Sequence, residues 1–164
     1  MRSTIIKFVA PAFAVASVLS MALPATADSQ SSIERKLATE LRGEFEVPGP
    51  GDPNGAGEFT GITTRDSDGD GQLCYTLATS KIANPTAAHI HNGLEGDSGP
   101  VVVELLAPTE LGVSECIVAV ANRFDTGPEL GKRDLRGIRN NPDAFYVNVH
   151  NSEYPDGAIR GQLR

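Results

Sequence analysis

Short segments of strand-forming residues, each ended by Gly, Pro, Asn or Asp, recur along the chain from residue 36 to its end. Turn signals at a spacing of roughly ten residues leave little room for long helices and favour antiparallel strands. The sequence therefore predicts an all-β fold, an antiparallel β-sandwich or barrel of about eight short strands. One short helix is expected near residues 130–141, where Leu130, Leu135 and Ile138 recur at helical spacing before Pro142.

The last predicted hairpin can be assigned a register from its hydrophobic alternation. Residues 145–150 and 158–163 alternate apolar and polar side chains on either side of the turn-forming sequence NSEYPDG. A loop over residues 151–157 separates the apolar from the polar face, whereas a slip of one residue would mix them. The apolar pairs are Phe145–Leu163, Val147–Gly161 and Val149–Ile159, and the pairs on the polar face are Tyr146–Gln162, Asn148–Arg160 and His150–Ala158.

The first 27 residues have the pattern of an export signal. Arg2 and Lys7 precede an apolar run over residues 8–23, and the small residues of Ala25-Thr26-Ala27 complete a cleavage site. The alternative is a transmembrane anchor, but the run is short for a bilayer core and no stop-transfer charges follow it. We therefore expect a signal peptide over residues 1–27, a disordered lead-in over 28–35, and a secreted or extracytoplasmic β domain over 36–164.

Charge and cysteine content narrow the class of protein further. A formal charge of −7 over 164 residues argues against a nucleic-acid-binding protein, which needs clustered Lys and Arg. The length also excludes a large multidomain enzyme. An even pair of cysteines in an exported chain predicts a disulfide between Cys74 and Cys116, the alternative being two free buried thiols.

The three histidines can converge on one side of the predicted sheet. His89 and His91 are two residues apart in a predicted strand and therefore share a face, and His150 lies opposite the small Ala158. A His-x-His pair with a third imidazole from another strand is a common site for copper or zinc. Alternatively, these imidazoles hydrogen-bond loop backbone and hold the sandwich closed, since the sequence does not show that the two strands are neighbours.

Two further motifs are set aside. Residues 96–100 (GDSGP) resemble the nucleophile loop of trypsin-like proteases, but one glycine is missing and no His-then-Asp order precedes the serine at a usable distance, so a strand-connecting turn is predicted. Asp66, Asp68 and Asp70 mimic the opening of an EF-hand loop. Leu77 stands where that loop needs a bidentate Glu, so a calcium site is not expected there.

Three pairs of segments together resemble the chordin-type CHRD domain family. The matching segments are residues 41–48 (LRGEFEVP) with 55–57 (GAG), 88–93 (AHIHNG) with 99–103 (GPVVV), and 146–150 (YVNVH) with 155–163 (PDGAIRGQL). The resemblance covers residues 37–163. It implies an extracellular all-β domain, repeated in chordin and single in small exported microbial proteins, without a settled activity.

The resemblance also bears on individual residues. All three histidines fall in its signature positions, which strengthens a joint site at His89, His91 and His150. Asn148, Arg160 and Gln162 fall there too, and we expect Arg160 to tether loop carbonyls or a carboxylate through its planar fork rather than to bind an anion. The two cysteines lie outside the family pattern, so their pairing rests on the export argument alone.

The sequence thus predicts an exported CHRD-like domain that acts as an extracellular binding or structural module, with an unidentified extracellular or cell-envelope partner. The first alternative is a mononuclear metal-binding protein that holds copper or zinc through the three histidines. The second is a copper-dependent oxidoreductase similar to superoxide dismutase, although three histidines supply only one of that enzyme's two metal sites. No catalytic residue is assigned.

Overall fold

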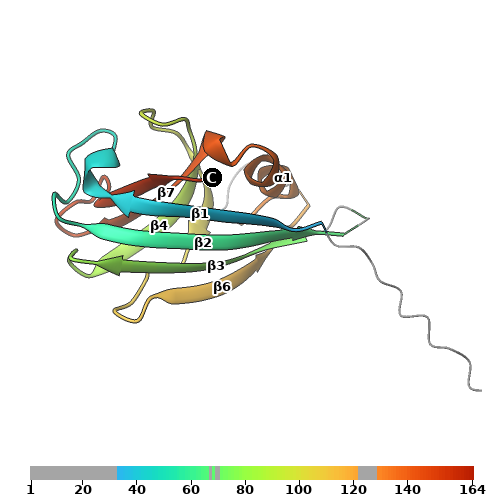
Figure 1. Cartoon of the computed structure of the whole chain (residues 1–164), viewed down its shortest axis with the longest axis horizontal. Helices are drawn as coiled ribbons and strands as arrows, with labels where there is room; N and C mark the ends of the chain where they lie inside the picture. Colours follow the sequence, from blue (N-terminus) through green and yellow to red (C-terminus); the bar gives the residue numbers. More distant parts are fainter. Residues whose placement is uncertain (1–32, 67, 69–70, 122–128) are drawn as a thin grey trace, which may run out of the picture.

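The structure is a computed structural model that describes residues 33–66, 68, 71–121 and 129–164. Eight strands in these residues form one antiparallel sheet in the order β5-β4-β7-β8-β1-β2-β3-β6, which curls into a half-barrel (Figure 1). The strands are β1 (Arg35–Arg42), β2 (Ala56–Arg65), β3 (Gly71–Ser80), β4 (Pro85–Asn92), β5 (Val101–Leu105), β6 (Val113–Val118), β7 (Phe145–Asn151) and β8 (Ile159–Gln162). The helical elements are η1 (Gly43–Phe45), α1 (Lys132–Asn140) and η2 (Pro142–Ala144). The predicted all-β class is confirmed.

The concave side of the sheet holds the hydrophobic core. Alternate residues of each strand turn inward, so that Leu41, Phe59 and Leu73 are fully buried while their neighbours along each strand are more exposed. The predicted helix is confirmed as α1, near the end of the sheet where β1 begins (Figure 1). Its Leu135 and Ile138 are buried in the core, together with Leu130 just before the helix.

The first strand is shorter than the sequence predicted. It was expected to run over residues 36–46, but β1 ends at Arg42 and the chain turns through η1. At Gly43 the backbone of Asp52 occupies the place that a Cβ would take. This close approach requires glycine. The Asp52 N–H donates to the Ala158 carbonyl (2.8 Å), which holds the loop that follows η1 beside the start of β8.

The predicted register of the last hairpin is confirmed. In the β7–β8 ladder Val147 lies opposite Gly161 and Asn148 lies opposite Arg160. The N–H of Ala158 donates to the Val149 carbonyl (2.8 Å), which closes the hairpin beside the loop. The hydrophobic alternation selects this register because only one face of the hairpin can enter the core.

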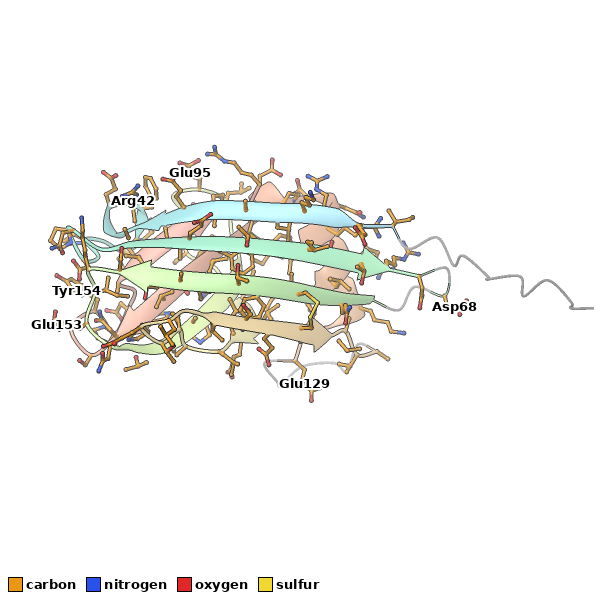
Figure 2. The ribbon with its side chains drawn as sticks, turned by 60° about the horizontal axis from the view of Figure 1, so that its bottom comes forward. Arg42, Asp68, Glu95, Glu129, Glu153 and Tyr154 are labelled. Carbon is orange, nitrogen blue, oxygen red and sulfur yellow. A yellow bond between two sulfur atoms is a disulfide. The ribbon has the colours of Figure 1, made fainter. Side chains whose placement is uncertain are left out.

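Cys74 and Cys116 form the predicted disulfide. They lie directly opposite each other on β3 and β6, and their sulfur atoms are 2.02 Å apart (the yellow bond in Figure 2). The alternative of two free thiols is thereby excluded. No helix in the described part of the chain is long and apolar enough to cross a membrane. The expected signal peptide, and residues 28–32 of the expected lead-in, lie outside the described residues.

Candidate metal centre

The pairing of β4 with β7 brings the three histidines together. His89 lies opposite Asn148, His91 opposite Tyr146, and Ala87 opposite His150. Since Ala88 and Ile90 point into the core, the imidazoles of β4 lie on the outer face, which is the polar face of the last hairpin. One ring nitrogen from each of His89, His91 and His150 lies within 4.8 Å of the other two. Among the described residues, these histidines are the group of three potential metal ligands whose ligand atoms lie this close together.

Two of the imidazoles are held by backbone carbonyls. The Nδ1 atom of His91 is 2.8 Å from the Gly99 oxygen, and Nδ1 of His150 is 2.9 Å from the Pro155 oxygen. A carbonyl oxygen can only accept, so each Nδ1 carries the proton and each neutral ring presents its lone pair at Nε2. A carbonyl that orients the remote nitrogen is the usual support of a metal-bound histidine. The Nε2 atom of His91 is buried and has no hydrogen-bond partner.

The spacing of two of the nitrogens matches that of metal ligands. Nδ1 of His89 lies 3.2 Å from Nε2 of His150. Two metal–nitrogen bonds of about 2.0–2.1 Å at a tetrahedral angle place their nitrogens about 3.3 Å apart. Without a metal, His89 Nδ1–H donates to the His150 lone pair. With a metal, that proton would move to Nε2 of His89 and both lone pairs would face the ion.

Burial favours the neutral form of two of the imidazoles. Desolvation, followed by the charges of His150 and His91, lowers the pKa of His89 from 6.5 to about 4. Desolvation also lowers the pKa of His91, although its bond to Gly99 opposes the shift. Because only the neutral imidazole binds a metal ion, the lowered pKa values extend toward lower pH the range in which these two lone pairs are available.

The ring of Tyr146 packs against the candidate centre at His91. Its ring stacks on His91, with centroids 4.7 Å apart, and the guanidinium carbon of Arg160 lies 3.4 Å from the same ring. Since β7 lies between β4 and β8, Tyr146 is held between an imidazole on one side and a cation on the other. The sequence placed Tyr146 on the polar face but gave no signal of this stacking, which depends on the pairing of β4 with β7.

Arg160 and Gln162 hold the loop between β4 and β5 over the outer face. Arg160 Nη2 donates to the Leu94 carbonyl (3.0 Å), and Gln162 Nε2 donates to the Gly93 carbonyl (2.9 Å). The Gly99 N–H donates to the Tyr146 hydroxyl (3.2 Å). Arg160 therefore bonds a loop carbonyl, one of its two predicted roles. Gln162 Nε2 also contacts the carbonyl oxygens of Asp143 and Phe145.

Asn148 lies in the middle of this arrangement. It is 3% exposed, and its side-chain oxygen is buried without a hydrogen-bond partner. His89 lies directly across from it on β4, and His150 lies two residues further along β7 on the same face. The sequence predicted its position beside Arg160, and the neighbouring strand adds its proximity to His89.

Glu46 is a buried residue that the sequence analysis did not single out. It is 6% exposed, and desolvation raises the pKa of its carboxyl from 4.5 to about 7, against the attraction of the nearby Arg160. Gly157 has a φ of +144°, which favours glycine, and the position that a Cβ would take there is within 2.5 Å of this carboxyl, so a larger residue would displace Glu46. Glu46 lies in the EVP sequence of the N-terminal motif, the one available signal.

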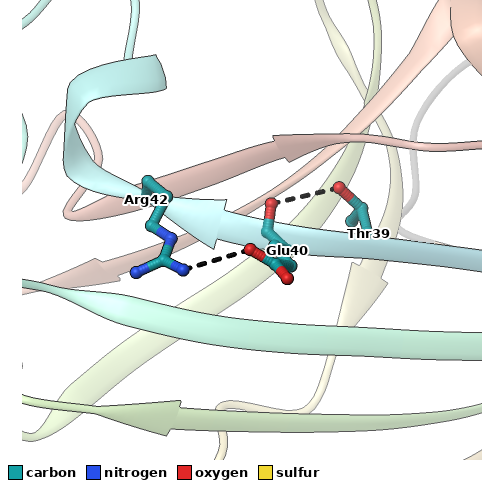
Figure 3. A network of polar contacts seen from close by, with 3 residues as sticks. All are labelled: Thr39, Glu40 and Arg42. Carbon is teal, nitrogen blue, oxygen red and sulfur yellow. Dashed lines mark hydrogen bonds and ion pairs between the residues drawn. The ribbon is translucent and has the colours of Figure 1, made fainter.

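Charged residues on β1 form a separate surface contact. Arg42 lies opposite Arg160 in the β1–β8 ladder but pairs instead with Glu40 at 3.1 Å (Figure 3). The Thr39 hydroxyl donates to the Glu40 carbonyl (3.1 Å). The Arg42 and Glu40 side chains are 47% and 76% exposed, so this pair contributes little to stability.

Among the described residues, the two motifs that were set aside contribute no side chain to the group of potential metal ligands. Residues 96–100 belong to the connection between β4 and β5, as predicted, and their contribution is the Gly99 backbone. In the acidic turn between β2 and β3, the N–H of Asp68 donates to the Asp66 carboxylate (3.0 Å), and residues 67, 69 and 70 lie outside the described residues.

Comparison with known proteins identifies one family. Residues 37–163, which include every strand except the first two residues of β1, match the family model of the CHRD domain. A search of curated proteins and a search of solved structures each returned no match. The match contains all three histidines together with Asn148 and Arg160.

Proposed function

The chain belongs to the CHRD domain family, and on that premise we propose that it is an exported binding module whose ligand is a single metal ion, copper or zinc, held by His89, His91 and His150. The observation that carries this proposal is the convergence of the three ring nitrogens within 4.8 Å. Export is supported by the signal-like residues 1–27 and by the disulfide, which persists in oxidising compartments.

The hydrogen bonds around the imidazoles support a ligand rather than a purely structural role. A structural histidine would satisfy both ring nitrogens, yet the buried Nε2 of His91 has no partner. Leaving a buried polar atom unpaired costs about 1–3 kcal/mol. A metal ion at the centre would use this lone pair and would also account for the carbonyls that orient the rings of His91 and His150.

The test is the metal content and metal affinity of the protein exported by its own leader. We expect the purified protein to bind one equivalent of Zn²⁺ or Cu²⁺ per chain by isothermal titration. The double variant His89→Ala, His91→Ala should lose this binding. As a matched control, Asp66→Asn with Asp68→Asn should bind as the wild type does.

Absence of binding in the wild type would overturn the proposal. So would binding that persists in the histidine variant and is lost in the aspartate variant, because the ion would then sit in the acidic turn. Copper-loaded protein assayed for superoxide turnover separates a binding module from the oxidoreductase alternative.

A further inference from the structure

Asn148 occupies the place in the sheet that all three histidines surround. On the outer face, His89 is its direct neighbour on β4 and His150 is its next neighbour along β7. His91 is opposite Tyr146, which is two residues before Asn148 on the same face, so His91 lies on the diagonal.

The amide oxygen of Asn148 needs an explanation. The side chain is only 3% exposed, and Oδ1 is buried with no hydrogen-bond donor. Buried side-chain oxygens in folded proteins nearly always accept a hydrogen bond or bind a metal ion. The buried Nε2 of His91 is unpartnered in the same way. These are two lone-pair atoms on adjacent strands of the same face, and a cation between them would satisfy both.

We infer that Asn148 supplies the fourth ligand of the metal centre through Oδ1, so that the site offers three imidazole nitrogens and one amide oxygen. This inference rests on the proposed function. A neutral set of three nitrogens and one oxygen suits Zn²⁺ and Cu²⁺, whereas Cu⁺ prefers sulfur ligands. With four protein ligands the centre has no open position, which favours holding the ion over turning over a substrate.

Three variants test the role of the oxygen. Asn148→Leu keeps the size of the side chain but removes the oxygen, and Asn148→Asp replaces the neutral oxygen with an anionic one. Asn92→Asp is the control, because Asn92 is exposed and close to His91 and gives the same change of charge as Asn148→Asp. Each protein is titrated with Zn²⁺, Cu⁺ and Co²⁺, and the visible absorption bands of bound Co²⁺ report its ligands.

We expect Asn148→Leu to weaken Zn²⁺ binding by about tenfold or more and to change the Co²⁺ spectrum. Asn148→Asp should tighten Zn²⁺ binding and shift the Co²⁺ bands, with a smaller effect on Cu⁺, and Asn92→Asp should behave as the wild type. If Asn148→Leu does not fold, the spectrum of Asn148→Asp decides. A wild-type protein that binds metal, with affinity and Co²⁺ spectrum unchanged in the Asn148 variants, overturns the inference and leaves the three-histidine site standing. A wild-type protein that binds none of these three ions and no Cu²⁺ overturns both.

Discussion

The imidazole of His91 lies flat against the phenol ring of Tyr146, with ring centroids 4.7 Å apart and ring planes inclined by 8°. Tyr146 is 3% exposed and is fixed on its other side by Arg160. The ring of His91 therefore has one orientation set by stacking and one hydrogen bond, to Gly99, that sets its tautomer. The proposed ligand is positioned before any ion arrives, which is what tight metal binding requires.

Removal of this stack should weaken metal binding. We expect Tyr146→Leu to raise the dissociation constant for Zn²⁺ by about tenfold, as for other residues that orient a ligand. Tyr146→Phe is the matched control, because it keeps the ring and loses only the hydroxyl that accepts the Gly99 N–H. Competition titration with a Zn²⁺ indicator measures the dissociation constants of both variants. Equal affinities for the Leu variant and the wild type would show that the stack does not position His91.

Replacement of Arg160 by lysine should destabilise the fold. Arg160 is 2% exposed, stacks on Tyr146 and donates to the Leu94 carbonyl, and lysine lacks the planar fork that makes both contacts. We expect a loss of about 2 kcal/mol, or a melting temperature lower by roughly 5–10 °C. The control is Arg42→Lys on the neighbouring strand, whose exposed side chain should change stability by less than about 0.5 kcal/mol. A melting temperature of Arg160→Lys equal to that of the wild type would contradict the assigned contacts.

Ionisation of the buried Glu46 carboxyl should lower the free energy of unfolding as the pH rises. Its carboxyl ionises at 4.5 when unfolded, but burial raises its pKa to about 7 in the folded state. Between these values the folded state binds more protons, so the stabilisation is complete below pH 4.5 and is lost as the pH rises through 7. The change in pKa from 4.5 to about 7 corresponds to roughly 3 kcal/mol of unfolding free energy, at about 1.36 kcal/mol for each pH unit.

The glutamine variant isolates this contribution. Relative to the wild type, Glu46→Gln should become more stable at pH 8 than at pH 5, because it has no carboxyl to ionise. The difference between the two proteins in urea unfolding at each pH removes the effect of every other titrating group. Glu44→Gln is the control, since Glu44 is exposed and only two residues away. A difference that does not change with pH would mean that Glu46 ionises normally in the folded protein.

Local pattern was sufficient to predict much of this fold. The alternation of residues 145–150 and 158–163 predicts the register of the β7–β8 hairpin, because the apolar face has only one partner, the core. The same parity predicts that His89 and His91 share a face. Strand ends were predicted less well. The residues that follow Arg42 still alternate, and the turn at Gly43 is imposed by the backbone of Asp52, which a local pattern does not contain.

The candidate centre required contacts between distant parts of the chain. His89 and His150 are 61 residues apart, and their contact depends on β4 pairing with β7, which no short motif specifies. The loop between β4 and β5 is held over the outer face by Arg160, which donates to the Leu94 carbonyl 66 residues away in the sequence. The resemblance to the CHRD family singled out the three histidines and Asn148 together, but the structure was needed to show that Asn148 is the common neighbour of the histidines.

The disulfide should stabilise the domain without affecting the metal centre. Cys74 and Cys116 are separated by 42 residues, and a closed loop of that length contributes about 4 kcal/mol in the chain-entropy model. The double variant Cys74→Ala, Cys116→Ala should lose about this amount in urea unfolding, and a reducing agent should destabilise the wild type but not the variant. In the sheet, β8, β1 and β2 separate β7 from β3, so the folded variant should bind Zn²⁺ with wild-type affinity. Denatured, non-reduced protein should show no free thiol on labelling. Full labelling of both cysteines, or equal stability of the two proteins, would contradict a structural role for this bond.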